Sequence, residues 1–197
     1  MSAQILGLAK ALQMIHDCPI DKDNVQDLSL DERGKPYGRH GDLKPENILW
    51  YKSEGSVLSN GPIGTLKIAD FGFADFHSEH SRSRVRRSAI GGITDTYKAP
   101  EYDVSQMVSP QYDIWSLGCI LLQFVVWYIR GWKGVDDFSK RRTEDSRGAT
   151  IASDIFFGLE LGVSRGFRAK AKVSVAEVSN PTISCDVRVA NTCGLDV

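Results

Sequence analysis

Hydrophobic residues at helical spacing define the first predicted element of the chain. Between residues 2 and 16, apolar side chains recur every three or four positions, which predicts an amphipathic helix that ends before Cys18 and Pro19. Residues 114–129 contain no charged residue and predict a fully buried core helix, followed by a polar segment at residues 131–147. The uncharged run is shorter than the about 20 residues that a membrane-spanning helix needs, so a core helix is the better interpretation.

Two short apolar runs predict β-strands, at residues 48–51 and 66–69. Gly, Ser, Asn and Pro dominate residues 53–64 between them, so we expect the strands to pair as a hairpin with a long connecting loop. Residues 70–101 lack periodicity and predict one long irregular loop. Loops of this length are uncommon in compact domains unless they are functional.

Composition limits the classes of function that the chain can serve. The 197 residues are 42% hydrophobic and 25% charged, which excludes wholesale disorder. The formal net charge of -1 gives no basic excess that would favour nucleic acid or an acidic membrane surface as a partner. No C-x-x-C pair predicts a zinc site, and the first residues lack the pattern of a signal peptide. The sequence therefore predicts a cytoplasmic or nuclear protein.

The strongest chemical signal lies directly before the first predicted strand, in the sequence HGDLKPEN at residues 40–47. Within six residues this stretch places the Asp42 carboxylate, the Lys44 ammonium group and the Asn47 side-chain amide. Such a set can accept a hydroxyl proton, neutralise a phosphate and hold a divalent metal ion. The simpler interpretation of Asp42 is a turn residue.

Three further motifs follow along the chain. The sequence DFG at residues 70–72 comes directly after the second predicted strand, and its carboxylate suits Mg²⁺, which prefers oxygen ligands. The sequence APE at residues 99–101 closes the long loop, and DIWSLG at residues 113–118 opens the predicted buried helix. Together with residues 40–47, these motifs resemble the protein kinase signature in identity and in chain order. The resemblance covers about residues 1–140.

The resemblance implies a fold and a reaction. The fold would be α+β and mainly helical, a partial kinase C-terminal lobe with a small β-hairpin over residues 1–147. The sequence Lys44-Pro45-Glu46 resembles Ser/Thr kinases rather than Tyr kinases. The implied reaction is therefore transfer of the γ-phosphate of ATP, with Mg²⁺, to Ser or Thr hydroxyls of a protein substrate.

The resemblance also implies a role for each residue that matches the motifs. Asp42 would accept the proton of the substrate hydroxyl, and Lys44 would contact the transferred phosphoryl group. Asp70 could also be a loop cap, as Asp42 could be a turn residue. The full set of implied residues is Asp42, Lys44 and Thr94 for catalysis, Lys44, Asn47 and Asp70 for ATP and Mg²⁺, and His40, Phe71, Gly72, Glu101 and Asp113 as structural support.

Three features depart from the kinase pattern. No G-x-G-x-x-G or Val-Ala-x-Lys sequence precedes residue 42, so we expect the N-terminal lobe to be absent from these 197 residues. Gly41 stands where arginine is usual, and that arginine usually pairs with a phosphorylated activation loop. Residues 172–178 and 182–190 alternate as strands do where the family continues with helices, so we expect residues 148–197 to form an atypical tail.

These departures favour a second functional hypothesis beside the kinase. The chain would then be a catalytically inactive kinase fragment or degenerate copy that acts by binding a partner. Under either hypothesis, we expect the 197 residues alone to have little kinase activity and weak ATP affinity. The arginine run at residues 82–87 is expected to be solvated, with docking of a phosphate or an acidic substrate as the alternative.

Overall fold

The computed structural model describes residues 2–17, 37–52, 64–77, 95–104, 109–146, 152–161 and 166–179. Thr94, the arginine run at residues 82–87 and the predicted strand at residues 182–190 lie outside the described residues.

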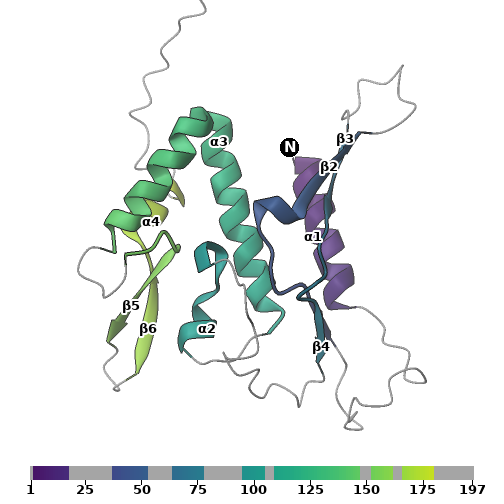
Figure 1. Ribbon diagram of the computed structural model, residues 1–197, viewed down its shortest axis with the longest axis horizontal. Helices are drawn as coiled ribbons and strands as arrows, with labels where there is room; N and C mark the ends of the chain where they lie inside the picture. Colours follow the sequence, from purple (N-terminus) through teal and green to yellow (C-terminus); the bar gives the residue numbers. More distant parts are fainter. Residues whose placement is uncertain are drawn as a thin grey trace, which may run out of the picture.

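Helices dominate the described residues, and the strands pair as three two-stranded antiparallel sheets (Figure 1). The prediction of a mainly helical chain with a small hairpin is thereby confirmed. The elements in chain order are α1 (Ser2–His16), β1 (Tyr37–Arg39), η2 (Pro45–Asn47), β2 (Ile48–Lys52), β3 (Gly64–Ile68), β4 (Asp75–His77), η5 (Asp95–Tyr97), α2 (Pro100–Val104), α3 (Gln111–Glu144), β5 (Phe157–Leu161), β6 (Phe167–Ala171) and α4 (Val173–Ser179), where η marks a short 3₁₀ helix.

The predicted first helix and hairpin are both present. Strands β2 and β3 pair in antiparallel register, with Ile48 opposite Ile68. Helix α1 packs against this hairpin, and its Gln4 side chain acts as an extra hydrogen-bonding partner for β3. The Gln4 amide nitrogen donates to the Gly64 carbonyl at 2.8 Å, and its oxygen accepts the Leu66 N–H at 3.0 Å. The long-loop prediction was partly wrong, because β4 within that region pairs with β1.

Helix α3 is longer than the sequence predicts. It kinks at Gly131, whose φ of 66° and ψ of -168° are not helical, and then continues to Glu144. The sequence analysis identified residues 131–147 only as a polar segment and did not predict this second half of the helix. After the kink, Val135, Phe138 and Arg142 lie on one face of the helix and are all buried. This narrow buried face stabilises the second half of the helix. Because most of the residues around it are charged, its helical periodicity is not evident from the sequence.

The first half of α3 is only partly buried, which corrects the prediction of a fully buried helix. Ser116, Leu117 and Ile120 are buried, but Tyr128 keeps 69% and Ile129 keeps 61% of its surface exposed. By length and composition, α3 is the one helix in the described part of the chain that could cross a membrane. A core helix of a soluble protein would pass the same test.

The region near the C-terminus also differs from the prediction. Residues 172–178 were predicted as a strand, but residues Val173–Ser179 form α4. The Ser174 N–H donates to the Asp145 carboxylate at 2.9 Å, and the Val175 and Ala176 N–H groups donate to the Lys172 carbonyl. These contacts at the start of the helix override the strand preference of its valines.

Aromatic side chains join the C-terminal elements to α3. Phe156 is 1% exposed, and its ring centroid lies 6.3 Å from that of Tyr97 and 5.9 Å from that of Phe138. The neighbouring ring of Phe157 meets Trp115 edge-on at 6.0 Å. The described residues after position 151 thus share one core with residues 97–142.

Truncation of Phe156 should measure how strongly this shared core holds the chain together. We expect Phe156→Ala to lower the free energy of unfolding by about 3–5 kcal/mol, because it leaves a cavity between two rings and a guanidinium group. Urea unfolding followed by circular dichroism measures the change. Leu161→Ala is the matched control, since Leu161 is 82% exposed and its loss should change the stability by less than about 0.5 kcal/mol. Equal effects of the two variants would contradict a shared core.

Candidate functional site

The polar stretch at residues 40–47 lies between two strands that fix both of its ends. Strand β1 ends at Arg39, and the turn η2 (Pro45–Asn47) leads directly into β2. Pro45 suits the start of this turn, because its fixed φ matches the first turn of a helix. The Asn47 N–H donates to the Lys44 carbonyl at 3.0 Å and closes the turn.

A buried carboxylate at the start of α3 holds the beginning of this loop. Asp113 is 0% exposed, and it accepts the His40 N–H at 2.8 Å and the Gly41 N–H at 2.9 Å. His16, the last residue of α1, places its Nε2 atom 3.0 Å from the same carboxylate. Burying a carboxylate is costly unless its lone pairs are filled, and these contacts fill them. Asp113 is therefore placed where it can support the loop, which is the role that the resemblance implies for it.

The backbone at Gly41 explains why glycine occupies this position. Its φ is +83°, in the left-handed region that glycine adopts without strain. A Cβ atom there would lie 2.8 Å from the Phe73 carbonyl oxygen, closer than real Cβ contacts. The departure of Gly41 from the kinase pattern thus has a local structural reason.

Three of the predicted side chains are in direct contact. Lys44 Nζ lies 2.7 Å from Asp42 Oδ2, and Asn47 Nδ2 donates to the Asp42 carbonyl at 2.8 Å and to Oδ2 at 3.4 Å. The hydrogen bond to Asp42 raises the pKa of Lys44, so the ammonium form is favoured. Within the described residues, both of these side-chain contacts of the Asp42 carboxylate are made by Oδ2.

His40 connects this cluster to the end of β3. Its Nε2 lies 3.0 Å from the Ala69 carbonyl oxygen, and its Nδ1 accepts the Asp42 N–H at 3.3 Å. Both contacts are satisfied by the neutral tautomer that carries its proton on Nε2. The Ala69 N–H in turn donates to the Asn47 carbonyl at 2.9 Å. The residue after Ala69 is therefore held beside the loop.

That next residue is Asp70, which has an exposed side chain and a φ of 62°. Its Oδ1 accepts the Gly72 N–H at 3.2 Å, and its negative charge contributes to the raised pKa of Lys44. The Phe71 ring lies 5.2 Å from the His40 ring. The structure therefore brings Asp42, Lys44 and Asn47 together, with Asp70 at the adjacent strand end.

The other two predicted residues are Thr94 and Glu101. Thr94 lies outside the described residues. Glu101 belongs to α2, and burial raises the pKa of its carboxyl group. The sequence analysis missed His16, which is 97 positions from its partner Asp113. The only sequence signal for His16 is its place at the end of the predicted first helix.

The chemistry of these donors suits a metal ion that also binds phosphate oxygens. Within the described residues, no three His, Cys, Asp or Glu side chains gather as a complete metal site. Mg²⁺ is commonly held by one or two protein oxygens together with substrate phosphates and water. Because Asp42 engages the Asn47 nitrogen, the amide oxygen of Asn47 and the Asp70 carboxylate are the groups that fit this role.

Comparisons with known proteins match the same region. The family model "Protein kinase domain" matches residues 39–146. The mouse dual specificity protein kinase CLK4 is 36% identical over 94 residues, which cover 43% of this chain and 18% of the relative. Rat serine/threonine-protein kinase D2 is 40% identical over 82 residues, which cover 42% and 8%. Schizosaccharomyces pombe serine/threonine-protein kinase chk1 is 39% identical over 87 residues, which cover 44% and 15%.

The chain thus spans less than a fifth of the length of these relatives. No solved structure matches it significantly.

The Asp113 contacts generate a prediction about the loop. We expect Asp113→Ala to lower the free energy of unfolding by about 1–3 kcal/mol, because two buried N–H groups lose their acceptor. Hydrogen exchange at the His40 and Gly41 amides should become faster. Asp137→Ala is the control, since Asp137 is exposed on the same helix. If those two amides stayed protected in a folded Asp113→Ala variant, the anchoring role would be wrong.

The left-handed backbone at Gly41 generates a second prediction. Gly41→Ala should destabilise the protein by about 1–2 kcal/mol, because an alanine with positive φ is strained. Gly118→Ala is the matched control: Gly118 lies within α3, and nothing lies within 4 Å of its added methyl group. This control should stabilise the helix by up to about 1 kcal/mol. Thermal unfolding distinguishes the two signs, and stabilisation by both substitutions would contradict the assigned backbone.

Proposed function

This chain belongs to the protein kinase domain family, and on that premise we propose that residues 40–72 form the phosphoryl-transfer part of a Ser/Thr protein kinase site. The observation that carries the proposal is the contact of Asp42 with Lys44 and Asn47, beside the Asp70 strand end. We assign the described residues up to position 146 to the C-terminal lobe of such a domain. Its substrates would be proteins in the cytoplasm or nucleus.

In this proposal Asp42 accepts the proton of the substrate hydroxyl. Lys44 engages its Oδ2 at 2.7 Å, which would leave Oδ1 to accept the proton. A carboxylate in this position raises the nucleophilicity of a Ser or Thr oxygen as the proton leaves it. Asp113 accepts the N–H groups of His40 and Gly41, the two residues before Asp42, and so keeps the backbone of Asp42 fixed.

Lys44, Asn47 and Asp70 form the phosphate and metal side of the proposed site. When bound, Mg-ATP would supply the phosphoryl group, and the metal ion would offset the charge of its phosphates. The oxygens of Asn47 and Asp70 would hold the metal ion, and the Lys44 ammonium group would contact the transferred group. The ammonium group is positively charged at neutral pH, and its hydrogen bond to Asp42 raises the pKa of Lys44 further.

The remaining predicted residues would support this arrangement. His40 and Asp113 would fix the loop through the hydrogen bonds described above. Phe71 would support it through its ring beside His40, and Gly72 through the hydrogen bond from its N–H to Asp70. Thr94 would steady the catalytic loop beside the substrate, as the resemblance implies. Glu101 would stabilise the end of the long segment that begins at Asp70 and closes with the APE motif at residues 99–101.

The first test is nucleotide binding by the 197-residue chain, measured with a fluorescent ATP analogue with and without Mg²⁺. We expect weak binding that Mg²⁺ strengthens, and we expect Asp70→Asn and Asn47→Ala to remove the Mg²⁺ effect. Asp137→Asn, which changes an exposed carboxylate of α3, should behave like the unchanged chain.

The second test is phosphoryl transfer from radiolabelled ATP to a library of Ser- and Thr-containing peptides. We expect slow transfer, because these 197 residues contain no glycine-rich loop to position the phosphates. Asp42→Asn should reduce that transfer by about 10²-fold or more while nucleotide binding remains. Transfer that survives this substitution would contradict the role of Asp42. Binding without any transfer would instead favour a binding module.

A further inference from the structure

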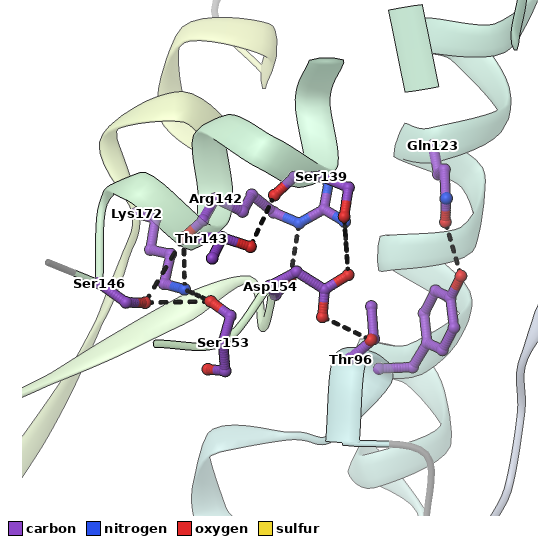
Figure 2. Close-up of polar contacts among 10 residues, drawn as sticks. Thr96, Gln123, Ser139, Arg142, Thr143, Ser146, Ser153, Asp154 and Lys172 are labelled. Atoms are coloured by element: carbon purple, nitrogen blue, oxygen red, sulfur yellow. Dashed lines mark hydrogen bonds and ion pairs between the residues drawn. The ribbon is translucent and has the colours of Figure 1, made fainter. Parts of the chain in front are cut away.

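A carboxylate outside the region matched by the family model joins two segments inside it. Asp154 Oδ1 accepts the Thr96 hydroxyl at 2.7 Å, and Oδ2 accepts the Ser139 hydroxyl at 3.0 Å (Figure 2). The Asp154 backbone carbonyl accepts Arg142 Nε at 2.7 Å. The matched region ends at residue 146, so the kinase resemblance assigns no role to Asp154.

Arg142 gives Asp154 a rigid partner. The Arg142 side chain is 0% exposed, and its guanidinium carbon lies 4.2 Å from the ring centroids of both Phe138 and Phe156. One guanidinium nitrogen lies 3.5 Å from Asp154 Oδ2 and forms an ion pair with it. A planar cation between two rings has little freedom to move, so it fixes the position of the carboxylate.

The backbone next to Asp154 is held independently of Thr96. Lys172 Nζ donates to the Ser153 carbonyl at 2.7 Å and to the Arg142 carbonyl at 2.8 Å (Figure 2). The Ser146 hydroxyl also donates to the Ser153 carbonyl, at 3.0 Å. Asp154 therefore has contacts that hold it without Thr96.

Thr96 lies in η5, which is held from its other side by the first half of α3. The Tyr97 carbonyl accepts the Ser116 hydroxyl at 2.9 Å, and the Tyr97 hydroxyl donates to Gln123 at 2.7 Å. Ser116 is one helical turn after Asp113, which holds the loop at His40. Residues 95–97 are thus fixed between the catalytic-loop anchor and Asp154.

We propose that Asp154 is a positioning residue that holds residues 95–99 through Thr96. This inference rests on the proposed function, because its consequence for activity runs through residues 95–99, which α3 connects to the proposed site by way of Ser116 and Asp113. The inference adds a residue after position 146, where the match to the family model ends, to the residues that support the proposed site. Removal of this contact should loosen residues 95–99 while leaving the cluster of Asp42, Lys44 and Asn47 unchanged.

The test compares three variants of the full 197-residue chain. Thr96→Val removes the hydroxyl donor with little change of shape, and Asp154→Asn removes the negative charge. Ser139→Ala is the matched control, because it removes the other hydroxyl that Asp154 accepts and leaves Thr96 intact. If Asp154→Asn fails to fold, Thr96→Val decides the result alone.

The direct readout is hydrogen exchange at the Lys98 amide, which donates to the Asp95 carbonyl at 3.1 Å within η5. We expect exchange faster by on the order of tenfold in Thr96→Val and Asp154→Asn, and unchanged in Ser139→Ala. The His40 amide should stay protected in all three variants. Unchanged Lys98 exchange in Thr96→Val would overturn the proposal.

Kinetics separate this inference from the proposed function. Thr96→Val and Asp154→Asn should raise KM for the peptide library and leave the affinity for Mg-nucleotide unchanged. An unchanged KM with faster Lys98 exchange would overturn the role in substrate positioning. Absence of Mg²⁺-dependent nucleotide binding in the unchanged chain would contradict the proposed function, and Lys98 exchange would still decide whether Asp154 holds Thr96.

Discussion

The candidate site depends on one buried carboxylate at the start of α3. Asp113 accepts two successive backbone N–H groups of the loop and meets His16 of α1, so it connects segments that are 72 to 97 positions away from it. A carboxylate without solvent is stable only while these partners remain, and the partners are fixed only while it stays in place. This mutual dependence gives the loop one geometry, from which the positions of Asp42, Lys44 and Asn47 follow.

Helix α3 connects the anchored loop to η5 and to the C-terminal elements. Ser116 and Gln123, on its first half, hold Tyr97 by its carbonyl and its hydroxyl group. The kink at Gly131 turns the second half back beside α4 and the C-terminal hairpin (Figure 1). That return brings Ser139 and Arg142 to Asp154. A straight helix could not hold residues 95–97 from both sides, so the kink is needed for this arrangement.

Local sequence patterns predicted the parts of the site that are local in the chain. The hairpin of β2 and β3 and the cluster at residues 40–47 follow from short motifs. The supporting role of Asp113, which is 73 positions from His40, was implied only by the resemblance to protein kinases. The second half of α3 and the helix α4 were missed, because their stability comes from a few buried residues and end contacts that composition does not reveal. The contacts of His16 and Asp154 join residues 97 and 58 positions apart, and no local pattern encodes such pairs.

The glycine at position 41 shows that loop geometry and side-chain charge are separate properties of this motif. Two successive N–H groups on one carboxylate form an anion-binding concavity, which here includes a residue of positive φ. Glycine adopts that backbone without strain, whereas arginine would strain it and bring its Cβ against the Phe73 carbonyl. The space beside Gly41 contains Arg39, whose buried Nε would lie 3.5 Å from such a Cβ. The chain therefore keeps the anchored loop at low strain without the arginine, and the contacts among Asp42, Lys44 and Asn47 form with glycine at position 41.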